Sequence, residues 1–446
     1  MGVSNPPSTS LFEMQHLDGE DSELFEKLAS ISSSSRNPEV ESAVASILKK
    51  VCDEGDDGLL SFTSQFDRAS LSSVEQCVTA SEFNQAEEAL ESRDRSAINE
   101  AIQNVRAFHS HCQSEDWMST NSHGGAVGER YYPLRRVGIY VPGGQVPLVS
   151  TVIMTTVLAK AAGVPEIAVT TPPRPDGTIA APLLAALSLC GVEEVYKAGG
   201  AQAVAALAYG TETIAPVDKI FGPGNAYVNE AKRQVFGTVG IDLLPGPSEV
   251  MVVADETARP AYVAAALLAQ AEHGSGKEKV FLLCLDENIL RLSLAETEKQ
   301  LETLSRRDAI RSVLKTGLLA IRVSSEKRAF EVANFVAPEH LELQIDDSKV
   351  ERFTSSITTA GSILQGHYTP TVLGDFAAGP SHVLPTGRTS RFSAGLRLSD
   401  FFRRSSIVRY DLEALCKADE VITRFSAMEE LDAHGRSLSI RFENFQ

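Results

Sequence analysis

Cysteines are few in this chain, and none of them forms a recognisable sequence pair. The 446 residues include six cysteines, and no two of them have the C-x-x-C spacing. The pattern therefore indicates neither a thiolate zinc site nor a disulfide framework. We expect the cysteines to behave as small buried hydrophobic residues in a reducing compartment.

Long apolar runs and an excess of positive charge are also absent. No apolar run approaches the roughly 18 residues of a membrane-spanning helix, and residues 1–10 lack the basic start and apolar core of a signal peptide. The 59 acidic residues exceed the 41 Lys and Arg, which gives a net charge of −18. Because this charge repels nucleic acid and anionic lipid, we expect a cytoplasmic protein that binds neither.

The middle of the chain alternates short apolar runs with helical stretches. The runs of the first series are Gly138–Val141, Ile167–Thr170, Val195–Tyr196 and Lys219–Phe221. The runs of the second series are Val250–Val253, Val280–Leu285 and Ile321–Val323. Strand and helix in alternation are typical of parallel sheets. The sequence thus predicts an α/β fold with two doubly wound, Rossmann-like, parallel-sheet domains.

The two ends of the chain differ from its middle. Residues 1–36 are Ser-rich and weakly patterned, which predicts a tail, whereas Pro38 opens an apolar helical stripe that runs to about Gly55. After Ser393 the pattern becomes helical and charged. We therefore predict small N- and C-terminal helical modules. The predicted units are 1–36, 37–138 joined with 249–393, 139–248, and 394–446.

Glycine-rich turns follow three of the predicted strands. They are Tyr140-Val141-Pro142-Gly143-Gly144, Gly199-Gly200-Ala201-Gln202 and Gly222-Pro223-Gly224-Asn225. Loops at the carboxyl ends of parallel strands are the natural ligand sites of an open α/β sheet. None of the three has the G-x-G-x-x-G fingerprint, so these loops alone leave both a nucleotide site and simple tight turns open.

Two pairs of polar residues are candidates for chemistry. Gln270 and His273 stand at i and i+3 of a helix predicted over 262–273. They would share a metal ion if further N or O ligands came from elsewhere, and a solvent-exposed helix end is the alternative. Glu339 and His340 follow a proline where a helix gives way to a strand. Neighbouring side chains on a strand point to opposite faces, so this pair is not expected to touch, and a surface strand start is the alternative to a site.

The stretch from Leu373 to Gly387 is a predicted irregular loop. It holds three glycines and two prolines around Asp375 and His382. A long loop of this kind is usually either functional or disordered, and the apolar residues within it disfavour disorder. The pattern therefore favours a functional loop.

Five blocks of the chain resemble signatures of the histidinol dehydrogenase family, in the family's order, from about Asn37 to near the C-terminus. They are Asp218–Asn225, Pro245–Val250, Gln270–Gly274, Ala337–Leu341 and Gly374–Thr386. The resemblance implies that L-histidinol is oxidised to L-histidine through the aldehyde, with two NAD, in the last steps of histidine biosynthesis. It also implies one divalent metal ion, zinc in the family, and an intertwined homodimer with shared active sites.

The resemblance also implies a set of site residues. The metal ligands would be Gln270, His273, Asp375 and His434. The substrate contacts would be Ser248, His382 and Glu429, together with the ligands Gln270, His273 and His434. The NAD contacts would be Tyr140, Gln202 and Asn225. NAD would thus bind 139–248, metal and substrate would bind 37–138 with 249–393, and 394–446 would complete the partner's site.

The implied chemistry suits these residue types. His340 is the predicted general base, because an imidazole with a pKa of about 6.5 can take the proton of a hydroxyl group. Glu339 would orient or deprotonate the water that adds to the aldehyde, and Glu429 would bind the cationic amine. The metal would hold the substrate's imidazole and amino group, which leaves the redox chemistry to NAD.

Departures from the family pattern leave an alternative substrate open. The chain departs from the pattern at Thr369-Pro370-Thr371 and at residues 145–148. These departures keep another small alcohol, such as a sulfonated diol, as the alternative substrate, whereas Glu429 favours histidinol.

Two hypotheses come from other classes of protein: a metal-dependent hydrolase with Glu339 as base and no NAD, and a catalytically silent metal-binding or scaffold protein. Formation of NADH from an alcohol discriminates against both.

Overall fold

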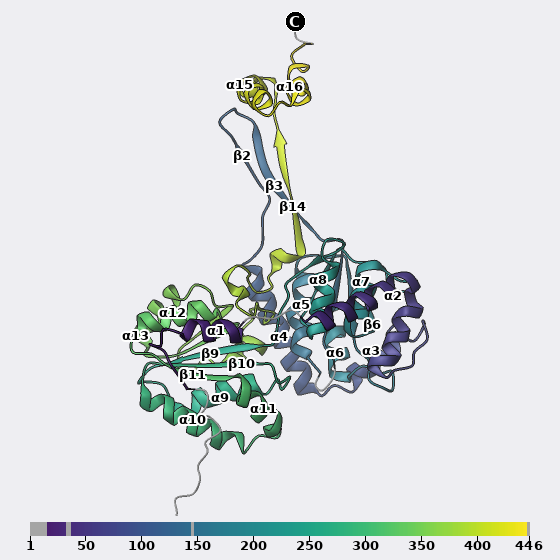
Figure 1. Ribbon diagram of the computed structural model, residues 1–446. Helices are drawn as coiled ribbons and strands as arrows, with labels where there is room; N and C mark the ends of the chain where they lie inside the picture. The colour runs from purple at the N-terminus through teal and green to yellow at the C-terminus, as the bar shows by residue number, and fades with distance from the viewer. Residues whose placement is uncertain (1–15, 33–36, 144–146, 444–446) are drawn as a thin grey trace, which may run out of the picture.

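The computed structural model describes residues 16–32, 37–143 and 147–443. Figure 1 shows two α/β units side by side and a long arm that projects from them and carries the C-terminus. No helix within the described ranges is long and apolar enough to cross a membrane. Residues 1–15 and 33–36 of the expected tail, Gly144 of the first glycine-rich turn and the departure at residues 145–146 lie outside the described residues.

The first unit is built on a five-stranded parallel sheet in the order β6-β5-β4-β7-β8. Its strands are β4 (Arg136–Tyr140), β5 (Glu166–Thr171), β6 (Glu194–Lys197), β7 (Lys219–Phe221) and β8 (Gly240–Ile241). Its helices α5 (Val149–Ala161), α6 (Ala181–Leu189), α7 (Gly200–Tyr209) and α8 (Ala226–Val235) alternate with the strands. Ile139 packs into one core and Tyr140 into the other, because successive side chains of a strand face opposite sides. The predicted doubly wound arrangement is confirmed here.

Three helices that precede this sheet in sequence cover both of its faces. They are α2 (Pro38–Phe62), α3 (Ala80–Glu88) and α4 (Ser92–Ser110). The predicted stripe of α2, including Val44 and Val51, is buried in the same core as α7 and α8, and α2 continues past a kink at Gly55 to Phe62. This packing differs from the predicted grouping of 37–138 with 249–393. The apolar stripe instead packs on the first unit, where the Ala-rich α7 offers a close-fitting surface.

The second unit holds a six-stranded parallel sheet in the order β1-β11-β10-β9-β12-β13. Its strands are β1 (His16–Asp18), β9 (Glu249–Ala254), β10 (Lys279–Cys284), β11 (Leu318–Arg322), β12 (His340–Gln344) and β13 (Ser362–Gln365). Helices α9 (Pro260–Ala271), α10 (Glu287–Leu301) and α11 (Arg307–Gly317) share a core with Val250 and Val252. Helices α1 (Leu24–Ser32), α12 (Glu326–Val336) and α13 (Asp347–Ser356) share the other core, with Met251 and Val253.

Part of the segment expected as a tail belongs to this second unit. Residues 16–18 pair in parallel with β11 as an edge strand, and Leu24 and Leu28 of α1 are fully buried. Burial of two leucines stabilises the helix by roughly 3 to 6 kcal/mol, which is enough to offset its weak sequence pattern. Residues 16–32 are therefore part of the fold.

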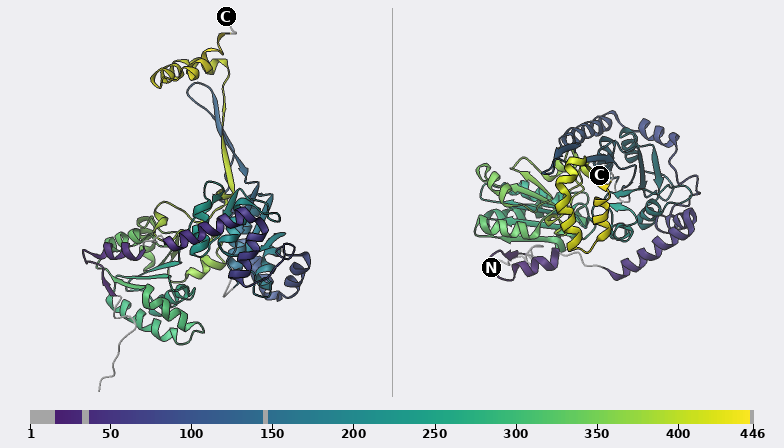
Figure 2. Two further views of the ribbon diagram at one scale, coloured as in Figure 1. Left: turned by 45° about the vertical axis from the view of Figure 1, so that its right-hand side comes forward. Right: turned by 90° about the horizontal axis from the view of Figure 1, so that it is seen from above.

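The arm is an antiparallel sheet with two helices at its tip. Its strands are β2 (Trp117–Thr120), β3 (Ala126–Pro133) and β14 (Phe402–Arg409), in the order β14-β3-β2. Two 3-10 turns, Thr389–Arg391 and Leu398–Phe401, precede β14, and α15 (Leu412–Met428) and α16 (Asp432–Ser439) follow it. The left-hand view of Figure 2 shows, as Figure 1 does, that the tip stands away from the α/β units. The prediction of a purely helical C-terminal module was wrong for 402–409, because these residues pair with 126–133, far away in sequence.

Candidate active site

Glu339 and His340 lie at the amino-terminal end of β12, an interior strand between β9 and β13. They are 5% and 6% exposed, and Oε2 of Glu339 lies 3.8 Å from Nδ1 of His340. The expectation that the two side chains would not touch, and the alternative of a surface strand start, were wrong. Glu339 precedes the first residue of the strand, so the strict alternation of strand side chains does not apply to it.

Asp375 approaches His340 from the other side. It lies on the short helix α14 (Thr371–Phe376), and its Oδ1 is 3.5 Å from Nε2 of His340. Burial acts to lower the pKa of the imidazole, but the carboxylates of Glu339 and Asp375 together raise the pKa of His340 above its ordinary value. The imidazole between these two carboxylates is thus suited to accept a proton and hold it.

A second buried carboxyl group, Glu249, stands beside Glu339. The backbone N–H of Glu249 donates to Oε2 of Glu339 at 2.7 Å, and the side chain of Glu249 accepts from the N–H of Gly387 at 3.2 Å. Burial raises the pKa of Glu339 to about 7, and burial together with the charge of Glu339 raises the pKa of Glu249 to about 8. Sequence analysis assigned no role to Glu249, although it stands next to Ser248 in one of the quoted blocks.

Replacing Glu249 by Gln should change the pH dependence of stability. The folded protein holds the proton of Glu249 up to a pKa of about 8, against an ordinary value of 4.5, so wild type loses stability as the pH rises from 4.5 through 8. Glu249→Gln removes this titration. We expect the variant to be about 3 to 5 kcal/mol more stable than wild type at pH 9 and nearly equal to it at pH 4.5, by guanidinium unfolding. The same difference at both pH values would contradict the account.

His273 and His382 both present one ring nitrogen to the site. Nδ1 of His273 lies 3.1 Å from the backbone oxygen of Gln270, and Nδ1 of His382 lies 3.0 Å from the backbone oxygen of Asp375. Because a carbonyl oxygen only accepts, each Nδ1 carries the proton and each Nε2 keeps its lone pair. Nε2 of His382 is 3.4 Å from the hydroxyl of Thr151, a residue of α5 in the first unit, so the loop that follows α14 contacts both units.

Three of the four predicted metal ligands lie in the second unit. Helix α9 ends at Ala271, so His273 stands beyond the helix and not, as predicted, on its face with Gln270. Burial acts to raise the pKa of Asp375, but the hydrogen bond to His340 and the nearby imidazoles of His340, His382 and His273 together lower it. Within 16–32, 37–143 and 147–443, no group of three His, Cys, Asp or Glu side chains has the arrangement of a metal site. A single copy of the chain brings together only part of the predicted ligand set.

The residues present nevertheless fit a borderline divalent ion. Gln270 is 4% exposed, and its amide nitrogen has no hydrogen-bond partner among the described residues, which is costly unless the side chain serves another group. An amide oxygen, a carboxylate oxygen and a free imidazole Nε2 are the donor types that zinc, manganese or cobalt accept.

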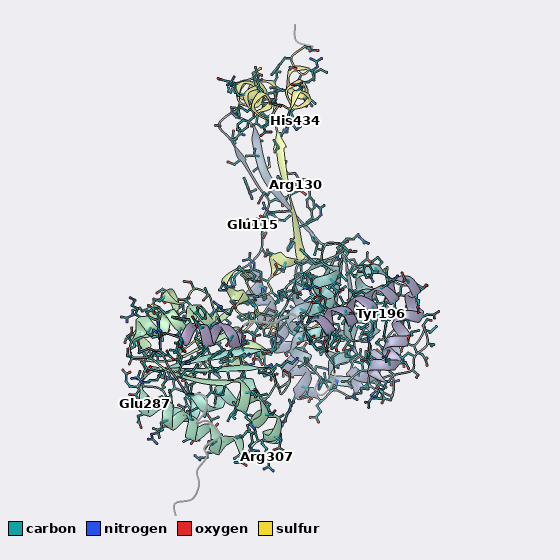
Figure 3. All side chains as sticks on the ribbon, in the orientation of Figure 1. Glu115, Arg130, Tyr196, Glu287, Arg307 and His434 are labelled. Atoms are coloured by element: carbon teal, nitrogen blue, oxygen red, sulfur yellow. The ribbon has the colours of Figure 1, made fainter. Side chains whose placement is uncertain are left out.

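Glu429 and His434 lie elsewhere. Glu429 follows α15 and His434 belongs to α16, both at the tip of the arm, and Figure 3 shows His434 far from the two α/β units. The structure of one chain therefore does not bring these two residues to Glu339 and His340.

The predicted cofactor residues lie at the carboxyl ends of the first sheet. Tyr140 ends β4, Gln202 is in the first turn of α7, and the backbone N–H of Gly200 donates to the Tyr140 hydroxyl at 3.2 Å. Asn225 caps α8, and its side chain accepts from the N–H groups of Tyr227 and Val228. Tyr140 and Gln202 thus both adjoin the turn at Gly200, while the side-chain oxygen of Asn225 accepts hydrogen bonds from the first turn of α8.

Thr371, where the chain departs from the family pattern, forms hydrogen bonds with a buried glutamate. The backbone N–H and the hydroxyl of Thr371 both donate to the buried carboxylate of Glu342, each at 3.1 Å. These bonds fix the start of α14, the helix that carries Asp375.

Ser248 immediately precedes β9, and its backbone oxygen accepts from the N–H of Lys279 at 3.1 Å. Ser248 is therefore one residue from Glu249.

Comparison with known proteins identifies the family of the chain. The family model for histidinol dehydrogenase matches residues 31–442 of the chain. The histidinol dehydrogenase of Geobacillus kaustophilus is 43% identical over 402 residues, covering 90% of this chain and 93% of that protein. The histidinol dehydrogenase of Listeria monocytogenes is 40% identical over 430 residues, covering 96% and 99%. The crystal structure of histidinol dehydrogenase from Elizabethkingia anophelis matches with a TM-score of 0.91 at 35% identity and covers 97% of this chain and 98% of that chain.

Proposed function

The chain belongs to the histidinol dehydrogenase family, and we propose that it oxidises L-histidinol to L-histidine through the aldehyde in two NAD-dependent steps. The observation that carries this proposal is the buried imidazole of His340 between the carboxylates of Glu339 and Asp375. An oxidoreductase that acts on an alcohol must remove a proton as well as a hydride, and His340 is placed for the first of these tasks. The relatives named above carry no other substrate in their names.

In the first oxidation His340 takes the hydroxyl proton of the substrate. The C–O single bond becomes a C=O bond as the carbinol carbon loses a hydride, which NAD accepts when bound. The raised pKa of His340 helps the imidazole to hold the proton until it passes to solvent. Tyr140, Gln202 and Asn225 are the residues proposed to hold the nicotinamide dinucleotide at the first sheet.

In the second oxidation the aldehyde first adds water. Glu339 has a pKa of about 7, so near neutral pH it can take a proton from the attacking water and later return it. The hydrated aldehyde then loses a hydroxyl proton to His340 and its second hydride, which a second NAD would accept when bound, and the resulting carboxylic acid releases its remaining proton to solvent to give the carboxylate of histidine. Ser248 and His382 are proposed to hold the substrate during both steps.

The substrate must also be fixed in place. A divalent ion, zinc in our proposal, would be held by Gln270, His273 and Asp375 and by His434 of a second copy of the chain, and it would orient the substrate's imidazole and amino group. Glu429 of that copy would bind the cationic amine. The free Nε2 of His273, which can donate its lone pair to a metal ion, supports this assignment.

The arm supports a homodimer with shared sites. Its tip exposes large apolar side chains in the single chain: Val421, Phe425, Met428, Leu431 and Ile440. Exposed apolar residues gathered on one small module indicate an interaction surface. A two-fold dimer that exchanges its arms would cover them and would carry Glu429 and His434 to the partner's Asp375.

Mixing two inactive variants tests this arrangement. His340→Gln and His434→Asn should each be nearly inactive, but their mixed dimer contains one site with both residues intact. Since half of the randomly formed dimers are mixed, we expect about a quarter of wild-type activity. His340→Gln mixed with Asp375→Asn is the matched control. It should stay inactive, because His340 and Asp375 of a site come from the same chain, so each site of the mixed dimer carries one of the two changes. If the first mixture also stays inactive after verified subunit exchange, the shared site is refuted.

Product analysis tests the proposed function. The purified chain with L-histidinol and NAD should form histidine, and prior removal of divalent metal should abolish this activity until zinc is returned. A sulfonated diol should not be oxidised. Oxidation of the diol but not of histidinol would overturn the substrate, and histidine formation unchanged by thorough chelation would overturn the metal.

A further inference from the structure

A buried carboxyl group stands behind the proposed cofactor turn. Asp67 ends the π-helical turn Thr63–Asp67 that follows α2. Its Oδ2 accepts from the side-chain Nε2 of Gln202 at 3.4 Å, and its Oδ1 lies beside Gly199, whose backbone N–H lowers the pKa of the carboxyl group. Burial nevertheless raises the pKa of Asp67 to about 6. Asp67 thus faces the Gly199-Gly200 turn and is ionised at neutral pH.

This contact sets the orientation of the Gln202 amide. An ionised carboxylate can only accept hydrogen bonds, so the NH₂ group of Gln202 must face Asp67 and the oxygen must face away. Gln202 is 1% exposed, and its Oε1 is buried with no hydrogen-bond partner among the described residues. A buried amide oxygen without a partner costs about 1 to 3 kcal/mol, which a ligand that donates to it would remove.

The Gly199-Gly200 turn leaves room for this oxygen because Gly200 has no side chain. Gly200 has a φ of +62°, and a Cβ at this position would lie 2.6 Å from Oε1 of Gln202. On the same residue, the N–H of Gly200 donates to the Tyr140 hydroxyl. Burial raises the pKa of Tyr140 to about 12, so this hydroxyl keeps its proton and can donate it to a ligand. A buried acceptor and a buried donor therefore both adjoin Gly200.

We propose that Asp67 is a positioning residue of the dinucleotide site, which fixes the amide of Gln202 so that Oε1 accepts a hydrogen bond from a hydroxyl, amine or amide group of NAD. The inference rests on the proposed function, because it takes Gln202 to be a cofactor contact. Asp67 acts only through Gln202 and the Gly199 turn and touches neither histidinol nor the reacting atoms.

A double-mutant cycle on NADH binding tests the proposal. NADH fluorescence is titrated without histidinol for wild type, Asp67→Asn, Gln202→Met and the double variant. Asp67→Asn keeps the shape of the side chain but can donate as well as accept, so Gln202 loses its fixed orientation. We expect the Kd for NADH to rise about 5- to 10-fold in Asp67→Asn, and the double variant to bind within about twofold of Gln202→Met. Asp286→Asn, the same change in a helix cap of the second unit, is the matched control and should bind as wild type.

A positioning role also predicts which parameters stay constant. At saturating NAD, the KM for histidinol and the thermal midpoint of Asp67→Asn should match those of wild type. Asp67→Ser, with a hydroxyl that donates or accepts, replaces the Asn variant if the latter is unstable. The proposal is overturned if Asp67→Asn binds NADH as wild type does, or if its effect is undiminished in the Gln202→Met background. Failure of wild type to bind NADH would overturn the NAD proposal as well, so the two failures are distinguishable.

Discussion

The His340→Gln variant should lose roughly 10²- to 10⁴-fold in kcat with histidinol as substrate, and a similar factor with the aldehyde. Glutamine fills the space of the imidazole but cannot accept a proton, and both oxidations require a proton to leave an oxygen. The affinity for NADH should not change, because Tyr140 and Gln202 lie in the other α/β unit, on β4 and α7. Steady-state rates with each substrate and an NADH titration measure these quantities.

His367→Gln is the matched control for this prediction. His367 is also a histidine of the second unit, but its ring contacts Gln344 and Thr257 instead of the carboxylates around His340. Its kcat should stay within about twofold of wild type, as expected for a residue that makes no contact in the transition state. If His340→Gln retained more than a tenth of the wild-type kcat, the assignment of His340 as general base would be wrong.

Lys232→Met should cause the largest loss of stability, about 3 to 5 kcal/mol. Lys232 and Asp242 form an ion pair with side chains 0% and 1% exposed, and removal of the lysine leaves the Asp242 carboxylate buried without its counter-ion. Lys232 also donates to the backbone oxygen of Gly222 at 2.9 Å, and the N–H of Gly222 donates to Asp242 at 2.7 Å. The ion pair thus holds the backbone of Gly222, in the glycine-rich turn that leads to Asn225, by two hydrogen bonds.

An exposed ion pair provides the comparison. Lys299 pairs with Glu296 at 3.0 Å but has a side chain that is 76% exposed. Lys299→Met should therefore cost less than about 1 kcal/mol. Guanidinium unfolding of both variants measures the two losses. Equal losses would show that burial of the ion pair does not determine its contribution.

The local patterns of the sequence identified the interior strands of the two parallel sheets, but not the edge strands β1, β8 and β13. Runs such as Val250–Val253 are apolar at every position because both faces of the strand are covered by helices, and this signal is local. The arm could not be predicted in this way. Residues 402–409 pair with 126–133, and a two-stranded contact between segments so far apart leaves no local pattern that distinguishes it from a charged helix.

The candidate site likewise combines residues that the local sequence indicates with contacts that only the fold determines. Glu339, His340 and Asp375 were singled out from their local sequence, and the resemblance supplied their roles, but their burial and mutual approach depend on β12 being an interior strand between β9 and β13. Glu249 and Asp67 were missed. Neither carries a sequence signal of its own: the raised pKa of Glu249 comes from burial beside Glu339, and Asp67 matters through its contact with Gln202.

The number of NADH molecules formed for each histidinol consumed tests the central claim most directly. Our account predicts two NADH and one histidine per histidinol at completion, because His340 serves both oxidations and Glu339 serves the hydration between them. One NADH with accumulation of the aldehyde would contradict the role of Glu339 in a complete second step. No NADH from histidinol would contradict the proposed function itself.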